Sequence, residues 1–534
     1  MTNLPRTLTY EAIFTLLSKR FDNTFLSLKD LPHPSTFKDM DRAVARIVQA
    51  IQNHEKIILI GDYDVDGVVS TSIMQRFFDA IDYPLAWIIP NRFTDGYGLS
   101  TTLIPRVAEY DLVITVDNGI SAVEAANECD RLGIDLIITD HHIVPETIPK
   151  AYAIINQKQS ECNFPHAEIC GAQIAWYLCS ALNKTLQTKR DMKVYLELVA
   201  MAIIADIMPL QHINRAMVQA GIKLLNQSQR PALRAYREQR NKQELSSEDI
   251  AFGLAPILNS AGRLEDASLA VAFLCSTNIY DARTQLESLM ALNDARKALE
   301  QEITDAATTE VDEGDKVIVV ASENWHEGVV GIVAARLARL FERPAIVLTK
   351  NGDVYKGSGR SFNGCDLFGL VDTQRQMLQK FGGHSAAIGL AINKNNLDAF
   401  RRALNIKATT LCNQKPFIDP DILGELPFSQ IGFPLIEMIA QFEPFGEANP
   451  KPKFLTRDVE ILAVQTMGKE SNHLRFTFGN QGTIHNAVQF KTYEQYDIGQ
   501  KVDVVYTINK NYFRGDTTIQ LMVEQVIRMR QQYA

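Results

Sequence analysis

Four short stretches in the first 206 residues concentrate carboxylates and imidazoles, the side chains that bind divalent metal ions. Three of them directly follow apolar runs that are typical of buried strands, at 57–60, 112–116 and 136–139. The carboxyl ends of parallel strands meet at one edge of an open sheet, where ligands bind, so we expect these groups to converge. The four stretches are Asp62-Tyr63-Asp64-Val65-Asp66, Asp117-Asn118-Gly119, Asp140-His141-His142 and Ala205-Asp206.

The first stretch places three carboxylates at alternate positions between a strand and a helix, with no Lys or Arg among them. Such carboxylates repel one another unless a cation neutralises them. Acidic caps at a helix N-terminus, which the helix dipole favours, account for one or two of the three. They do not account for three carboxylates beside a matching set elsewhere. The pattern therefore favours metal binding by Asp62, Asp64 and Asp66.

The other three stretches are weak signals singly and a stronger signal together. An Asp-Asn-Gly sequence alone indicates a turn, and Asp206 alone is an ordinary residue after an apolar helix. The adjacent His141 and His142 are less easily explained as core residues. Together, the four stretches supply oxygen and nitrogen donors for two neighbouring ions, and such donors suit Mn²⁺ or Mg²⁺. Two ions would activate a water and stabilise a leaving oxygen, which predicts a metal-dependent hydrolase.

Two glycine-containing stretches further along the chain combine hydroxyl, guanidinium and imidazole groups. Glycines let backbone amides approach an anion closely, and arginine binds phosphate through two parallel hydrogen bonds. Ordinary turns with a surface arginine explain either stretch alone, whereas both facing the acidic edge would form a phosphate clamp. The stretches are residues 356–361, which include Ser358 and Arg360, and residues 381–384, which include His384.

The C-terminal region alternates apolar and polar residues at 474–478, 502–508 and 518–523, a pattern typical of a small β-barrel. Aromatic residues lie among cations there, an arrangement that holds single-stranded nucleic acid without reading its bases. About half of such aromatics are core residues in any small barrel, so the signal is weak alone. The set comprises Phe476, Phe478, Tyr506, Tyr512 and Phe513, with Lys491, Lys510 and Arg514.

Length, charge and cysteine content bound the class of protein. A chain of 534 residues is too long for one core and predicts about three domains. The net charge of −9 argues at face value against a nucleic-acid partner, but from Lys451 onward 11 Lys and Arg stand against 8 Asp and Glu. Seven scattered cysteines fit a reducing compartment. Without an apparent secretory signal or bilayer-spanning run, we expect a cytoplasmic protein with no membrane contact.

Strand and helix patterns alternate from residue 56 to about 205, and the continuous apolar strands predict a parallel sheet covered on both faces. Residues 172–182 and 195–204 are expected to form buried helices. The region 214–308 is mostly helical, and its charged, periodic end, 282–308, predicts a bridging helix. A second α/β unit begins at residue 316, so the predicted class is α/β with a C-terminal β-barrel.

These motifs, in this order, resemble the DHH phosphoesterase superfamily and, within it, the RecJ family of bacterial single-strand-specific DNA exonucleases. The resemblance runs from Lys56 onward and includes Gly262-Arg263-Leu264, Gly382-Gly383-His384 and residues 444–450. The residues before it, which include Pro32 and Pro34, are expected to form an N-terminal extension (1–45) packed on the core. The resemblance implies a parallel-sheet DHH catalytic domain (46–215) and a helical connecting region (216–312). An α/β DHH-associated substrate-binding domain (313–410) and an OB-fold nucleic-acid-binding domain (411–534) follow.

The resemblance assigns roles to single residues. The expected metal ligands are Asp62, Asp64, Asp66, Asp117, His141 and Asp206, with Asp117 bridging two ions. His142 matches a residue that contacts the scissile phosphate, so Asp117, His141 and His142 form the expected catalytic set. Many relatives carry a histidine four residues before the position of Asp64. Ile60 stands there in this chain, and Asp62 is expected to contribute instead, directly or through water.

The expected substrate contacts lie in both α/β units. Arg92 and Tyr97 match a DNA-contacting pair near the active centre, and Ser358 and Arg360 match contacts to a 5′-phosphate. The full set is Arg92, Tyr97, Asn118, Arg263, Ser358, Arg360 and His384.

The implied activity is that of a 5′→3′ exonuclease that degrades single-stranded DNA to 5′-mononucleotides with two Mn²⁺ or Mg²⁺ ions, in DNA repair and recombination. A single-strand-binding protein and a RecQ-type helicase are implied partners. The rival enzyme is a DHH phosphodiesterase for oligoribonucleotides or cyclic dinucleotides, but such enzymes resemble only the first two domains. A non-enzymatic scaffold that has lost its metal ligands is disfavoured, because all matched carboxylates and both histidines are present.

Overall fold

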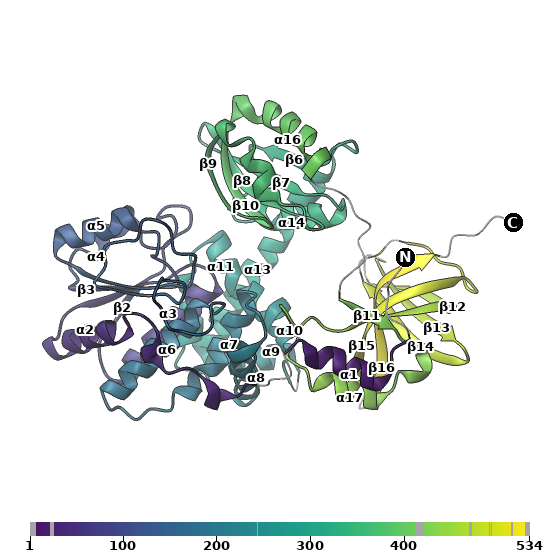
Figure 1. Ribbon diagram of the computed structural model, residues 1–534, viewed down its shortest axis with the longest axis horizontal. Coiled ribbons are helices and arrows are strands. Elements are labelled where there is room, and N and C mark those ends of the chain that lie inside the picture. The colour runs from purple at the N-terminus through teal and green to yellow at the C-terminus, as the bar shows by residue number, and fades with distance from the viewer. Residues whose placement is uncertain are drawn as a thin grey trace.

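The computed structural model describes residues 7–21, 26–242, 244–411, 421–468, 472–490, 492, 494–513 and 516–528. Figure 1 shows three bodies, namely a sheet with its helices, a second α/β unit and a β-barrel. Helices of the middle region lie between them. The long helix α13 (Ile279–Thr308) runs from these helices toward the second unit, so the predicted bridging helix is confirmed.

The first body contains a five-stranded sheet in the order β2-β1-β3-β4-β5, with every pair parallel. Successive side chains of each strand enter different cores. Ile57 and Leu59 belong to one core with α2, α3 and α6, whereas Ile58 and Ile60 belong to another on the opposite face. The sheet is therefore covered on both faces, as its continuous apolar strands predict. Its elements are α2 (Met40–Asn53), β1 (Ile57–Ile60), α3 (Val65–Ala80), β2 (Ala86–Ile88), α4 (Ile104–Val107), β3 (Leu112–Val116), α5 (Val123–Leu132), β4 (Asp135–Thr139), β5 (Ala153–Ile155) and α6 (Gly171–Thr185).

The helical region packs on the same core as α3 and α6. Its first helix, α7 (Leu196–Ala205), is apolar throughout and buried over nearly all its length, as predicted for 195–204. It packs lengthwise on α8, where Gly221 lies so close to α7 that a Cβ there would be 2.3 Å from the carbonyl oxygen of Leu196. The remaining helices are α8 (His212–Gln227), α9 (Pro231–Arg240), α10 (Ser247–Asp249), α11 (Ala255–Leu264) and α12 (Ser268–Cys275).

The second α/β unit has a mixed sheet in the order β6-β7-β8-β10-β9, with only β6 and β7 parallel. The sequence pattern did not indicate β9, which carries the Gly-Gly-His stretch at its end. Residues 356–360 lie within β8, in agreement with the strand that the sequence pattern predicts at 355–361. Its Gly357 is required by packing, because a Cβ there would be 2.0 Å from the carbonyl oxygen of Val347. The elements are β6 (Ile318–Ser322), α14 (Val330–Leu340), β7 (Ala345–Asn351), β8 (Val354–Arg360), α15 (Leu367–Asp372), β9 (Leu378–His384), β10 (Ala387–Asn393) and α16 (Leu397–Leu411).

The C-terminal body is a closed barrel, because β12 pairs with both β13 and β15 while β14 and β15 both pair with β16. A short strand, β11 (Ile422–Glu425), adds to β12 in parallel. The helix α17 (Phe433–Ala440) packs against the barrel core. The barrel strands are β12 (Lys453–Met467), β13 (His473–Asn480), β14 (Thr483–Phe490), β15 (Lys501–Phe513) and β16 (Asp516–Arg528).

The N-terminal helix α1 (Tyr10–Lys19) packs on the barrel and not on the first sheet. Its Ile13 and Leu17 are fully buried in the barrel core, and the amide of Leu8 donates to the carbonyl of Glu425 at 2.8 Å. Figure 1 shows α1 beside α17, although the two helices are more than 400 residues apart. The first and last segments of the chain thus form one body.

Two further expectations concern cysteines and membranes. Five cysteines are free, namely Cys129, Cys162, Cys170, Cys179 and Cys275. Cys365 is disulfide-bonded, so the prediction of scattered thiols does not hold at that position. Among the described residues, the helices lack the combination of length and apolar composition that crossing a bilayer requires.

Candidate metal centre

The carboxyl-terminal edge of the first sheet gathers the predicted acidic and imidazole groups. Asp62 and Asp64 follow β1, Asp117 follows β3, His141 follows β4, and Asp206 caps the C-terminus of α7. The pieces meet because β1, β3 and β4 are parallel neighbours and because α7 packs against α3. Convergence at this edge, predicted because the stretches follow strands of a parallel sheet, is confirmed.

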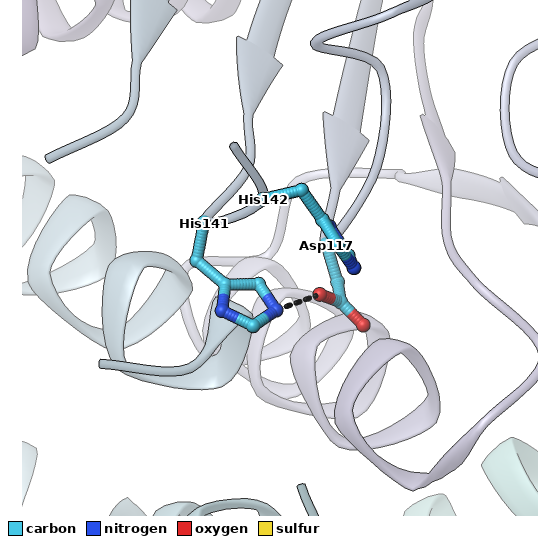
Figure 2. A group of neighbouring side chains, drawn as sticks. All are labelled: Asp117, His141 and His142. Atoms are coloured by element: carbon cyan, nitrogen blue, oxygen red, sulfur yellow. Dashed lines mark ion pairs between the residues drawn. The ribbon is translucent and has the colours of Figure 1, made fainter. Parts of the chain in front are cut away.

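His141 and Asp117 lie at the centre of this arrangement. The Nε2 atom of His141 is 3.2 Å from Oδ1 of Asp117, the contact that the dashed line marks in Figure 2. It is also 3.6 Å from Oδ2 of Asp206 and 3.7 Å from Oδ2 of Asp66. Three sets of side chains offer ligand atoms that all lie within 4.8 Å of one another. They are Asp66, His141 and Asp206, then Asp62, Asp64 and Asp117, and then Asp117, His141 and His142.

Burial makes this cluster electrostatically costly without a cation. Desolvation, followed by repulsion from Asp66, Asp64, Asp62 and Asp206, raises the pKa of Asp117 well above its usual value. Desolvation and neighbouring carboxylates also raise the pKa values of Asp62 and Asp64, and they raise the pKa of Asp206 to about 8. Carboxylates with such pKa values stay ionised at neutral pH only if positive charge is brought to them.

The unpaired atoms of the cluster fit a divalent metal. Among the described residues, Oδ1 of Asp117 and Oδ2 of Asp206 are buried and accept no hydrogen bond. Burial lowers the pKa of His141, so its imidazole is neutral and keeps a lone pair for coordination. Carboxylate oxygens with a neutral imidazole form a donor set that suits Mn²⁺ and Mg²⁺. Asp117 belongs to two of the three sets, so it lies between two candidate positions.

Local hydrogen bonds orient the acidic side chains. Oδ1 of Asp64 accepts from the amides of Asp66 and Gly67, so Asp64 is also the N-cap of α3. The carboxylate of Asp66 accepts from the amides of Gly171 at 2.5 Å and Ala172 at 2.8 Å. Helix capping therefore explains part of the acidic stretch. Capping does not explain Asp62 of that stretch, nor does it explain Asp117 after β3.

The sequence did not indicate the helix N-terminus that supports the site. At Gly171 a Cβ would lie 2.6 Å from the Cβ of Asp117, so only glycine lets α6 approach this closely. Asp117 itself has a φ of 64°, a left-handed conformation that costs energy in a non-glycine residue and is typical of functional sites. A Cys-Gly-Ala sequence carries no charge or spacing signal that could have revealed this role.

His142 differs from its neighbour because Asp140 holds it. Nδ1 of His142 is 2.7 Å from Oδ1 of Asp140, and the other carboxylate oxygen accepts from the amide of Ile120 at 2.9 Å. Despite desolvation, this partner raises the pKa of His142 to about 9, so the ring is a cation at neutral pH. About half of the His142 side chain remains exposed. The motif therefore pairs a neutral imidazole with a charged one. Asp140 acts through His142 and is a positioning residue.

An aromatic and cationic rim borders the cluster. The guanidinium of Arg92 lies 4.7 Å from the ring centre of Tyr63, which packs edge-on against Tyr97 at 5.9 Å. Tyr97 in turn packs edge-on against His142 at 6.2 Å. Arg92 and Tyr97 are thus beside the metal cluster, as expected. Tyr63, inside the acidic stretch, was not among the predicted contacts.

Arg263 of α11 lies where the helical region meets the second unit, and it donates to the carbonyl of Gly328 at 3.4 Å. Burial, followed by repulsion from Arg92 and Arg296, lowers the pKa of Arg263 to about 10, and Arg360 adds to the repulsion. Across this boundary, Phe93 packs edge-on against His326 at 5.5 Å. Guanidinium groups from the first unit, the helical region and the second unit therefore repel one another at this boundary, where the charge of a polyanion would relieve the repulsion.

Ser358 and Arg360 face the start of α14. A Cβ at Gly331 would lie 3.3 Å from Nη2 of Arg360 and 3.4 Å from Oγ of Ser358. The N-terminus of a helix favours an anion, so these groups could bind a phosphate together. Arg360 and His384 pair with the same residue of β10, Ala387, from either side, which places them in one row of the sheet.

Comparisons with known proteins identify the family. Residues 56–203 match the model of the DHH family, N-terminal domain, residues 314–409 match the DHHA1 domain, and residues 422–525 match the RecJ OB domain. The single-stranded-DNA-specific exonuclease RecJ of Salmonella typhimurium is 31% identical, over 91% of this chain and 90% of that protein. The chain belongs to the RecJ family. The RecJ of Bacillus subtilis is 34% identical, over 96% of this chain and 67% of that protein.

A solved RecJ structure has the same fold. The crystal structure of RecJ from Thermus thermophilus in complex with Mn²⁺ is 25% identical, with a TM-score of 0.82, and covers 98% of this chain and 78% of that one. The RecJ OB domain matches the tail, the part of the chain to which the resemblance to the rival phosphodiesterases for oligoribonucleotides or cyclic dinucleotides is not expected to extend. The exonuclease interpretation is therefore preferred over that rival.

One predicted substrate contact of this chain needs correction. The side chain of Asn118 is fully buried. Its amide nitrogen donates to the carbonyls of Ile60 and Val116, and its oxygen accepts from the amide of Leu99. No part of Asn118 is available to a nucleic acid, so its function is to fix the loop that carries Tyr97.

For three of the barrel aromatics the structure decides between the two interpretations, a nucleic-acid platform and core. Phe476, Phe478 and Tyr506 are fully buried in the barrel core. The hydroxyl of Tyr506 bonds to that of Thr456, which places it inside the barrel. Lys510 is partly exposed on β15. Lys491, Arg514 and the side chains of Tyr512 and Phe513 lie outside the described residues.

Proposed function

We propose that the protein is a metal-dependent 5′→3′ exonuclease that degrades single-stranded DNA to 5′-mononucleotides. The observation that carries the proposal is the overlap of two ligand sets at Asp117 in a chain of the RecJ family. The proposed ligands of two Mn²⁺ or Mg²⁺ ions are Asp62, Asp64, Asp66, Asp117, His141 and Asp206. Ions held by these residues would supply activation of a water for in-line attack and neutralisation of the departing oxygen.

The protein supplies the remaining chemistry through its own side chains. Asp140 keeps His142 charged, and His142 stabilises the negative charge that develops on the scissile phosphate. Arg92 and Tyr97 hold the adjacent nucleotide, the former by charge and the latter by stacking. Because their positions are set by packing and by hydrogen bonds within the fold, the binding energy is available at the transition state.

The second unit determines polarity in this proposal. Ser358 and Arg360 of β8, which face the N-terminus of α14, bind the 5′-phosphate. Arg263 and His384 contact the DNA strand between the two units. A terminal phosphate bound there places the first phosphodiester at the metal cluster. A duplex is much wider than one strand, so steric exclusion accounts for single-strand specificity.

The proposed domain limits follow the predicted ones. The matched family models fall within the catalytic domain at 46–215, the substrate-binding domain at 313–410 and the barrel domain at 411–534. The extension at 1–45 and the helical region at 216–312 complete the chain. We also propose a cytoplasmic location, a role in DNA repair and recombination, and single-strand-binding protein and a RecQ-type helicase as partners, all on the basis of the family resemblance.

The test is a nuclease assay with oligonucleotides labelled at either end. A 5′-labelled strand should release labelled mononucleotide at the earliest times, whereas a 3′-labelled strand should shorten progressively. Chelator should abolish both, and a blunt duplex should persist. Release of 3′-terminal nucleotides first would contradict the polarity. Faster cleavage of dinucleotides than of long strands would favour the phosphodiesterase instead.

A further inference from the structure

Residues 441–450, between α17 and the barrel, lie outside the proposed active site yet make an extensive contact with the catalytic half. Six of their carbonyl oxygens accept hydrogen bonds from residues outside the barrel strands. Five of them accept from the first body and the helices packed on it, which we call the catalytic half. These donors are Arg215 to Gln441 and Glu443, Gln219 to Glu443, Ser247 to Phe445, the amide of Leu210 to Glu447 and Gln211 to Ala448. The sixth carbonyl, that of Pro450, accepts from Arg20 of the N-terminal segment that packs on the barrel. We call residues 441–450 the clasp.

Asn449 organises the clasp. Its side chain is fully buried, and its amide nitrogen donates to the carbonyls of Phe442 at 2.8 Å and Pro444 at 2.9 Å. Its Oδ1 accepts from Nη1 of Arg20 at 3.2 Å. Gly446 and Asn449 also pair through both backbone groups. The two carbonyls that Asn449 binds, those of Phe442 and Pro444, alternate along the chain with those of Gln441, Glu443 and Phe445, which accept from the catalytic half.

The clasp reaches the metal cluster through the loop after α7. This loop, 207–211, directly follows Asp206, and the amide of its Leu210 donates to the carbonyl of Glu447 at 2.8 Å. The side chain of Leu210 is buried against Gly446, and a Cβ at Gly446 would lie 2.7 Å from Cδ1 of Leu210. On the other side, Asn214 donates to the carbonyl of Pro209 at 3.0 Å. The loop is thus held between the catalytic half and the clasp.

Asp206 depends on this loop because its own carboxylate is weakly held. Its Oδ2 accepts no hydrogen bond from the described residues, and about a quarter of the side chain is exposed. Ile207, the next residue, has a φ of 55°, a conformation that surrounding contacts must maintain. The direction of the Asp206 carboxylate is therefore set by backbone that the clasp helps to fix.

We infer that the clasp positions Asp206 for metal binding, so that Asn449 and Gly446 are positioning residues of the metal centre. The barrel is then a structural part of the active site as well as a nucleic-acid-binding module. This inference rests on the proposed function, since it requires Asp206 to be a metal ligand. It concerns residues that contact neither the metal nor the strand.

The test compares Asn449→Ala with the matched variant Asn480→Ala in the full-length protein. Asn480 also donates from a nearly buried side chain to two carbonyls, those of Arg457 and Asp458, but within the barrel. Calorimetric titration of the metal-free proteins with Mn²⁺ should show binding about tenfold weaker in Asn449→Ala, in keeping with the loss of groups that orient ligands. Asn480→Ala should bind Mn²⁺ within about twofold of the unaltered protein.

Two further readouts guard against simple misfolding. Hydrogen exchange at the amide of Leu210 should be faster in Asn449→Ala than in Asn480→Ala, with melting temperatures measured for both. Gly446→Ala should also weaken Mn²⁺ binding, because its methyl group would displace Leu210. Leu210→Val removes the clashing Cδ1 atom, so the double variant should recover part of the affinity.

Unchanged Mn²⁺ affinity in Asn449→Ala, with only a raised KM for long strands, would overturn the inference and leave the clasp as an attachment for the barrel. The proposed function would survive that result, since the unaltered protein would still bind Mn²⁺ and hydrolyse DNA. Failure of the unaltered protein to bind Mn²⁺ would instead refute the function itself.

Discussion

Replacing Asp140 by asparagine should convert the charged His142 into a neutral ring without removing it. Against desolvation, the hydrogen bond and charge of Asp140 are the largest of the effects that raise the pKa of His142 to about 9, and Asp206 and Asp62 add to them. Without that carboxylate the pKa should return toward its ordinary value of about 6.5. At pH 8 a group with a pKa of about 9 is about nine-tenths protonated, whereas one with a pKa of about 6.5 is about one-thirtieth protonated.

The expected loss of kcat at pH 8 is about tenfold. The full change in protonation corresponds to about thirtyfold, but the His142 side chain is 48% exposed, so solvent screens part of the ion pair. The sign of the pH dependence follows from the raised pKa. Activity of the unaltered protein should fall as pH rises through about 9. Activity of Asp140→Asn should begin to fall at lower pH.

The assay combines pH–rate profiles with NMR titration of the His142 ring in the metal-free protein. Asparagine keeps one acceptor for the backbone amides, and melting curves check that the fold survives. A double-mutant comparison supplies the decisive control, because Asp140→Asn should cost nothing further in a His142→Gln background. Additive losses, or an unshifted His142 pKa, would refute the proposed link between the two residues.

Three other perturbations test the metal site and the phosphate site. Gly171→Ala should weaken Mn²⁺ binding and reduce kcat by at least about tenfold, because a Cβ there would lie 2.6 Å from the Cβ of Asp117. Calorimetry would measure the binding and rate measurements the kcat, and wild-type values of both would contradict the prediction. Asp117→Ala should abolish hydrolysis while circular dichroism and melting show an intact fold, and activity near the wild-type rate would refute the assignment. The pKa of Asp206 is raised to about 8 in the folded protein. Between about pH 4 and pH 8 the unfolded chain has released this proton and the folded chain retains it, so the metal-free protein should lose stability as pH rises through this range. Added Mn²⁺ should therefore raise the Tm more at pH 8 than at pH 6, and an equal rise at both would contradict the reasoning.

Much of the fold was predictable because local patterns determined it. Apolar strands between amphipathic helices predicted a doubly covered parallel sheet, and the first sheet has that form. The bridging helix followed from its periodicity. Strand β9 was missed because its Gly-Gly-His end has low strand propensity, and its pairing with β10 overrides that preference. The packing of α1 on the barrel depends on contacts between the two ends of the chain, which no local pattern reports.

For the site, the sequence alone determined which residues could bind metal, because carboxylates after parallel strands must meet at one edge. Only the tertiary structure distinguished neighbours of similar type. Asn118 is buried by its hydrogen bonds, while His141 is neutral and His142 is charged because of what each one contacts. The structure alone brought Gly171 and the clasp to the metal ligands. The physical reason is that burial, pairing and close approach are properties of three-dimensional neighbours, which spacing along a chain does not specify.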